Sequence, residues 1–104
     1  MQGRLFWVKE CFLPSIEDGR KSLEIRLAVA PFLSVASGDK VEFNRRGVRK
    51  TVAGIRRYSD FESMLAAENP ERIAPGESRE RILGELQRVY GKREQNGVLV
   101  FELK

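Results

Sequence analysis

The sequence predicts one small α+β domain over residues 1–104, in which about five strands form a partly closed mixed β-barrel. Two or three helices are expected to fill the connections between those strands. Three observations carry this prediction. Most apolar segments are short and rich in β-branched and aromatic residues. Two others have helical spacing instead, and the length of 104 residues suits one modest core.

The first half of the chain contains the patterns of three strands. Residues 4–9 form a predicted strand with apolar side chains on both faces, which favours a central position in the sheet. A short helix follows over residues 14–18, opened by a proline and closed by Gly19. Alternation of apolar and polar residues predicts further strands over 22–26 and 40–44.

A hairpin is predicted next, with residues 44–47 as its loop and a return strand over residues 48–58. The apolar parity of the return strand shifts at Gly54, which indicates a β-bulge. Residues 97–103 are apolar on both faces almost to their end and predict a closing strand.

Two helices are predicted in the second half. Ser59 and Glu62 have the spacing of a capping box, which places the N-cap at Ser59. The apolar stripe that starts at Phe61 continues at helical spacing to Glu68, so this carboxylate is expected on the inward face. A glutamate at a helix end also commonly turns to water or pairs with an arginine. The second helix is expected over residues 78–90.

Composition excludes several classes of function. The net charge of +4 permits an anionic partner without requiring one. The chain has no histidine, and its single cysteine, Cys11, cannot form an intramolecular disulfide or a multi-cysteine zinc site. Cys11 is expected to be a small buried residue. No segment has the length of a membrane span or a signal peptide, so we expect a cytoplasmic protein without metal or cofactor.

One charged segment stands out, where a turn at Gly19 leads directly into a strand. Lys21, Glu24 and Arg26 are crowded together there, with Glu24 able to reach either cation. Such a segment can simply be a strand with one solvated, ion-paired face. The spacing Gly19-x-Lys21-x-x-Glu24-x-Arg26 nevertheless resembles the signature of the ASCH domain, a branch of the PUA-like superfamily.

Other features support this resemblance over essentially the whole chain. They are Gly38-Asp39 before a strand, the segment 58–65, Tyr90-Gly91 at a helix end and Gly97-Val98. The resemblance implies a PUA-like β-barrel with a cleft lined by the motif strand, and binding of RNA, a nucleoside or a nucleotide.

The chain is also similar to the small bacterial N4-acetylcytidine amidohydrolases of this family. Lys21 and Glu68 match the catalytic lysine and glutamate of those enzymes, whereas Glu24 occupies the position of their threonine. The resemblance therefore implies Lys21, Glu24 and Glu68 as candidate catalytic residues of a hydrolase that acts on acylated cytidine or cleaves RNA. A carboxylate next to Lys21 stabilises its ammonium form, which favours binding over catalysis.

Binding of RNA requires cations for phosphates and an aromatic surface for bases. Two groups of residues could supply them, at the motif and along the hairpin. The candidate binding residues are Arg20, Lys21, Ser22, Glu24, Arg26, Arg45, Arg46, Arg49, Arg56, Arg57 and Tyr58. Charges at a hairpin also serve to prevent edge pairing between proteins. A third possibility is a protein-interaction adaptor, because some ASCH domains occur in transcription coactivators.

Overall fold

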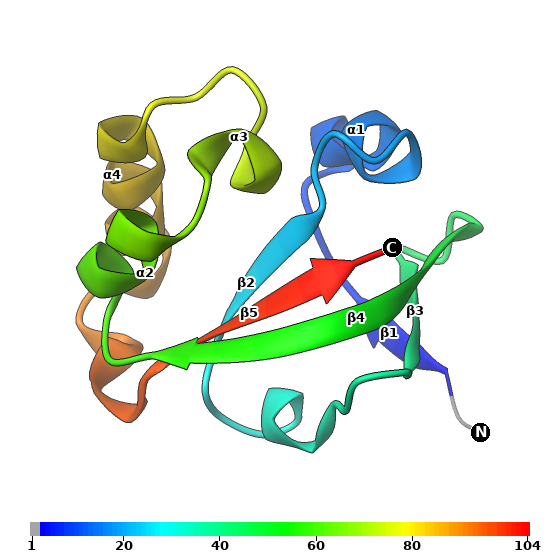
Figure 1. Cartoon of the computed structure of the whole chain (residues 1–104), viewed down its shortest axis with the longest axis horizontal. Coiled ribbons are helices and arrows are strands. Elements are labelled where there is room, and N and C mark those ends of the chain that lie inside the picture. The colour runs from blue at the N-terminus through cyan, green and yellow to red at the C-terminus, as the bar shows by residue number, and fades with distance from the viewer. Residues whose placement is uncertain (1–2) are drawn as a thin grey trace.

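The computed structural model describes residues 3–104 and shows a mixed sheet rolled into a half-barrel, with helices gathered at one end (Figure 1). The sheet has five strands, in the order β1-β3-β4-β5-β2. They are β1 (Arg4–Phe6), β2 (Leu23–Leu27), β3 (Lys40–Phe43), β4 (Val48–Tyr58) and β5 (Val98–Leu103). This architecture confirms the predicted α+β class and the partly closed barrel.

Strand pairing follows from the hairpin and from β4, the longest strand. β1 pairs with β3 in parallel, and the remaining neighbours are antiparallel. The register of β4 against β5 shifts between Val52 and Gly54, which confirms the predicted bulge. After the shift, Gly54 and Arg56 lie on the outer face of the sheet, beside Glu102 and Val100 of β5.

The prediction that residues 4–9 form a central strand was wrong, because β1 is short and lies at one end of the sheet order. Its apolar side chains on both faces have another explanation. Phe6 points into the core and is 2% exposed, whereas Leu5 is 36% and Trp7 61% exposed. Arg26 at the other end of the sheet donates through Nη2 to the Trp7 carbonyl at 2.7 Å, which joins the two ends of the half-barrel.

Two apolar clusters stabilise the fold. One fills the barrel interior around Phe6, Phe43 and Phe101, whose rings meet edge to face. The other lies between the sheet and the helices, around Leu23, Phe61 and other buried side chains. Both faces of β5 are therefore buried, which explains its nearly continuous apolar sequence.

The helices are α1 (Leu13–Glu17), α2 (Phe61–Ala67), α3 (Pro70–Ile73) and α4 (Arg79–Tyr90). The predicted capping residue of α2 was wrong by one position. Asp60 is the N-cap, and its carboxylate accepts from the Ser63 amide at 2.7 Å, whereas Ser59 lies outside the helix. Ser59 and Asp60 can both cap a helix, and only the backbone geometry separates them. Cys11 is exposed, contrary to expectation.

Candidate functional site

Lys21 lies at the turn before β2, and its amide donates to the Ser15 carbonyl of α1 at 2.9 Å. Its side chain is buried, and the Nζ atom donates to the carbonyls of Leu23 at 3.0 Å and Ile73 at 2.7 Å. Glu24 Oε1 lies 3.2 Å from the same nitrogen. Two of the three ammonium protons are thus directed at carbonyls, and the contact with Glu24 is an ion pair. Lys21 thus joins the start of β2 to α3.

Glu24 connects the two cations of the motif. Its Oε1 faces Lys21, and its Oε2 lies 3.1 Å from Arg26 Nη1, without hydrogen-bond geometry. Burial alone would raise the pKa of this carboxyl group. The charges of Lys21 and Arg26 outweigh burial, so the pKa of Glu24 lies below its usual value.

Arg26 completes the chain of buried charges. It donates to the Ile25 carbonyl at 2.8 Å, in addition to the Trp7 contact that joins the ends of the sheet. Its guanidinium lies 5.1 Å from the Phe6 ring centroid and 5.5 Å from that of Phe32. The motif is thus a buried connection between α3, β2 and β1, not a solvated strand face.

Glu68 is buried at the C-cap of α2, and it pairs with an arginine, which is the alternative that the sequence left open for this residue. Arg56 donates to its carboxylate through Nε at 2.6 Å and Nη2 at 3.0 Å. The Tyr58 hydroxyl donates to it at 2.5 Å. The hydrogen bonds from Arg56 lower the pKa of Glu68 against the opposing effect of burial, with a further contribution from Tyr58. The same contact raises the pKa of Tyr58.

A second carboxylate extends this group of charges toward solvent. Glu102 accepts from Arg56 Nη1 at 2.8 Å and from Arg72 Nη2 at 3.1 Å. Arg72 Nε donates to the Ser22 hydroxyl at 2.8 Å. We name Ser22, Arg56, Glu68, Arg72 and Glu102 the arginine–glutamate network. The side chains of Arg56, Arg72 and Glu102 are 37%, 39% and 33% exposed, so a ligand can reach them.

The buried motif and the arginine–glutamate network meet where β2 begins. The Ser22 amide donates to the Arg72 carbonyl at 2.9 Å, and the next carbonyl of α3, that of Ile73, accepts from Lys21. Within residues 3–104 no hydrogen bond or ion pair joins Lys21 directly to Glu68. The two candidate catalytic residues that the resemblance implies thus have no direct contact in the described part of the chain.

Sequence reasoning missed Arg72 and Glu102 as members of this site. Glu102 had a detectable signal, because it is the one charged residue within the apolar strand β5. Arg72 had none, since its contacts depend on how α3 lies over the sheet.

The remaining predicted binding residues are dispersed over the surface. Arg20 pairs with Asp18 at 2.9 Å, and Arg57 donates to the Asn96 carbonyl at 2.7 Å. Arg46 pairs with Glu10 at 2.9 Å.

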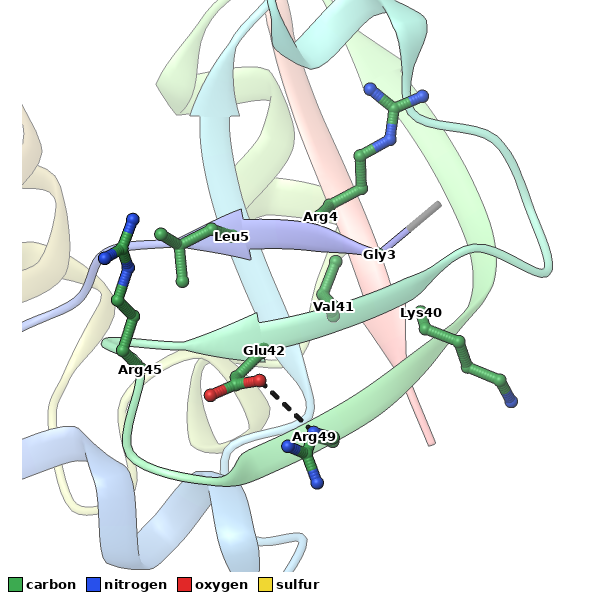
Figure 2. Close-up of a pocket in the computed structure, with 8 residues that line it drawn as sticks. All are labelled: Gly3, Arg4, Leu5, Lys40, Val41, Glu42, Arg45 and Arg49. Atoms are coloured by element: carbon green, nitrogen blue, oxygen red, sulfur yellow. Dashed lines mark hydrogen bonds and ion pairs between the residues drawn. The ribbon is translucent and has the colours of Figure 1, made fainter. Parts of the chain in front are cut away.

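Arg45 and Arg49 line a hollow of about 370 Å³ on the outer side of β1 and β3 (Figure 2). This hollow is separate from the arginine–glutamate network. The predicted binding residues therefore do not form one continuous site.

Two classes of site find no support in the described part of the chain. Residues 3–104 contain no group of three or more cysteine, aspartate or glutamate side chains placed to hold a metal ion. Among the helices of the same range, none has the length and apolar character needed to cross a bilayer.

The half-barrel, with helices over one end and a charged motif at the start of β2, defines a PUA-like α+β fold. The chain belongs to the ASCH domain family, whose model matches residues 7–103. This confirms the resemblance carried by the motif. Comparison with curated proteins gives no match.

Solved structures share the fold. The crystal structure of hypothetical protein PH0355 is 27% identical, with a TM-score of 0.91, and the alignment covers 99% of this chain and 98% of that one. A Pyrococcus furiosus protein solved by solution NMR is also 27% identical, with a TM-score of 0.82 and coverage of 99% and 96%. The ASCH protein of Zymomonas mobilis is 14% identical, with a TM-score of 0.65 and coverage of 98% and 66%.

Proposed function

We propose that this chain is an RNA-binding ASCH domain of the cytoplasm that holds a nucleotide of single-stranded RNA at the arginine–glutamate network beside the motif strand. One observation supports this proposal above the others. Arg56 and Arg72 are partly exposed, yet Glu68, Glu102 and Ser22 fix their guanidinium groups from below. Cations that are already held in place lose little side-chain freedom when they bind a phosphate.

Within this proposal the buried motif has a supporting role. Lys21 and Glu24 hold the start of β2 against α3, and this placement brings Ser22 to Arg72. Glu102 presents carboxylate oxygens that can accept from an exocyclic amine of a base, while the two arginines contact phosphate. The motif therefore positions the ligand-binding side chains without touching the ligand.

The alternative function is hydrolysis with Lys21 as nucleophile or base and Glu68 as proton carrier. It requires a free amine at Lys21, but the Lys21 nitrogen donates to two carbonyls and forms an ion pair with Glu24. Both oxygens of Glu68 accept from Arg56 or Tyr58. These contacts favour binding, and incubation with N4-acetylcytidine and with RNA provides the test. Product formation that is lost in both Lys21→Ala and Glu68→Gln would establish the alternative.

Binding is measured by fluorescence anisotropy of a labelled single-stranded RNA at low salt. We expect Arg72→Gln to weaken the affinity and to reduce the slope of log affinity against log salt by about 0.7, the share of one phosphate contact. Arg81→Gln is the matched control, because Arg81 is an exposed arginine on α4 that pairs with Glu77. Equal affinities of the two variants would contradict the proposed site.

A further inference from the structure

The outer side of β1, β3 and the first part of β4 forms a second surface that the ASCH motif does not include. In the strand register Leu5 lies beside Glu42, and Glu42 lies beside Arg49, so these three side chains form a row across the strands. The hollow of about 370 Å³ lies over this row (Figure 2). We name this region the outer-strand surface and include Trp7 in it.

Cations dominate the outer-strand surface. The lining residues of the hollow include one carboxylate, Glu42, and four cations, which are Arg4, Lys40, Arg45 and Arg49. Arg4 is already paired with Asp39 at 3.4 Å and donates to Ser34. Glu42 pairs with Arg49 at 3.2 Å, as Figure 2 shows. Among residues 3–104, the Lys40 ammonium donates to the neutral Thr51 hydroxyl at 2.8 Å and forms no ion pair. The surface therefore has an excess of positive charge that suits an anionic polymer.

Arg45 is an exposed cation that a ligand can reach. Its side chain makes no hydrogen bond or ion pair with any residue in the range 3–104, and it lies beside Leu5 in Figure 2. Its backbone has φ +53°, in the left-handed region that an arginine rarely adopts. Positive φ at two successive residues is the geometry of a tight hairpin turn, which the Arg46 amide closes by donating to the Phe43 carbonyl at 3.0 Å.

The neighbouring residue, Asn44, holds the backbone of this turn. Asn44 also has positive φ, +56°, and its buried side chain accepts from the Val8 amide at 2.8 Å. It donates to the Val8 carbonyl at 2.7 Å and to Glu10 at 2.9 Å. The turn that carries Arg45 is thus fixed to the segment that carries Trp7.

Trp7 supplies an aromatic surface next to these cations. Leu5 and Trp7 flank the inward-pointing Phe6, and both are exposed. Trp7 follows the last residue of β1 and does not line the hollow itself, and we include it in this surface because it adjoins the strand end. Trp7 is 61% exposed, although its carbonyl is fixed by Arg26 and the next residue by Asn44. A large exposed aromatic ring on a fixed backbone is a suitable platform for stacking an unpaired base.

We propose that the outer-strand surface is a second contact site for single-stranded RNA, in which a base stacks on Trp7 and the phosphates contact Arg45 and Lys40. This inference rests on the proposed RNA binding. It assigns one nucleotide of the strand to the arginine–glutamate network and another part of the same strand to the outer-strand surface. The two surfaces share one side of β4, where Arg49 precedes the bulge and Arg56 follows it. Seven strand residues span about 23 Å, so one RNA strand can reach both.

Trp7 is the single tryptophan of the chain, so its intrinsic fluorescence reports on this surface alone. We expect titration with an unlabelled single-stranded RNA at low salt to quench this emission saturably. Arg45→Asn removes the cation and retains a residue that tolerates positive φ, so the turn is preserved. This variant should weaken binding several-fold, and Trp7→Ala should weaken it about tenfold in the anisotropy assay. Trp7→Phe, which keeps a ring, should retain part of the affinity.

The outcomes separate this inference from the proposed function. The second site is overturned, and the first kept, by the following combination of results. Arg72→Gln loses affinity, RNA leaves the Trp7 emission unchanged, and Arg45→Asn and Trp7→Ala bind RNA as the native chain does. Quenching that persists in Arg72→Gln but is weakened in Arg45→Asn supports the second site. Absence of RNA binding at low salt overturns both. Arg81→Gln again serves as the control for loss of one surface charge.

Discussion

At the scale of single residues, the motif illustrates how a buried charge depends on its partners. We predict that Lys21→Met lowers the free energy of unfolding by about 3 kcal/mol, because it removes the cation that compensates buried Glu24 on one side. Arg26 still faces the other carboxylate oxygen and limits the loss. Urea denaturation at neutral pH measures this change.

The control for this prediction is the double variant Lys21→Met with Glu24→Gln. If the two side chains stabilise each other, the double variant loses less stability than the sum of the single variants. Strictly additive losses would show that Lys21 acts through its two carbonyl partners and not through Glu24.

The carboxylate of Glu68 gives a prediction about pH. Its pKa is lower in the folded protein than its usual 4.5, chiefly through hydrogen bonds from Arg56. Its stabilising contribution is therefore complete above that usual value and disappears as pH falls through the lowered pKa. We expect Glu68→Gln to be less stable than the native chain near pH 7, and this difference to shrink near pH 3. A stability difference of the same size at pH 7 and pH 3 would contradict the ionic role of Glu68. The control is Glu77→Gln, which removes an exposed ion pair and should change the stability little at either pH.

At the scale of elements, helix α2 allows the two capping candidates to be compared directly. Asp60→Ala removes the acceptor of the Ser63 amide and should lower stability by about 0.5–2 kcal/mol. Ser59→Ala should have a smaller effect, because the Ser59 hydroxyl contacts only the Ser63 hydroxyl, at 3.5 Å. Thermal unfolding measures the stability loss of each variant. A larger loss in Ser59→Ala than in Asp60→Ala would show that Ser59 is the N-cap, as the sequence predicted.

The start of β5 supplies another comparison. Gly97 has φ +98°, and a Cβ atom there would lie 3.0 Å from the Tyr58 carbonyl oxygen. Gly97→Ala should therefore destabilise the protein by more than about 1 kcal/mol. Gly84→Ala, in α4 with open space around it, should instead stabilise by up to about 1 kcal/mol. Chemical denaturation of the pair checks both signs, and stabilisation by Gly97→Ala would be incompatible with the observed turn.

The elements show which structural features a sequence can predict. Alternation and helical spacing predicted the strands, the bulge at Gly54 and the inward position of Glu68, because these features depend on local periodicity. The position of β1 at the end of the sheet was not predictable in this way, since periodicity does not specify neighbours. Trp7 was accordingly assigned to a central strand, although it is exposed.

At the scale of the whole molecule, the site was predictable only in part. The motif residues could be identified from their order and spacing, but not their burial, which depends on α3 and on the end of β1. Arg72 and Glu102 are thirty residues apart and meet only through tertiary packing. The net charge of +4 likewise gave no indication that cations concentrate on the outer-strand surface.

The last prediction concerns the two surfaces acting on one RNA strand. On an RNA long enough to follow β4, Arg45→Asn and Arg72→Gln should each reduce the salt slope by about 0.7, and the double variant by about 1.4. An RNA strand too short to cover the distance of about 23 Å between Arg49 and Arg56 on the outer side of β4 can occupy one surface at a time. On such a short RNA the double variant should lose most of its affinity. Each single variant should lose less affinity, because its unchanged surface still binds the RNA. Fluorescence anisotropy with RNAs of increasing length measures this pattern. If the affinity losses of the two variants do not depend on RNA length, the two surfaces do not bind the same strand.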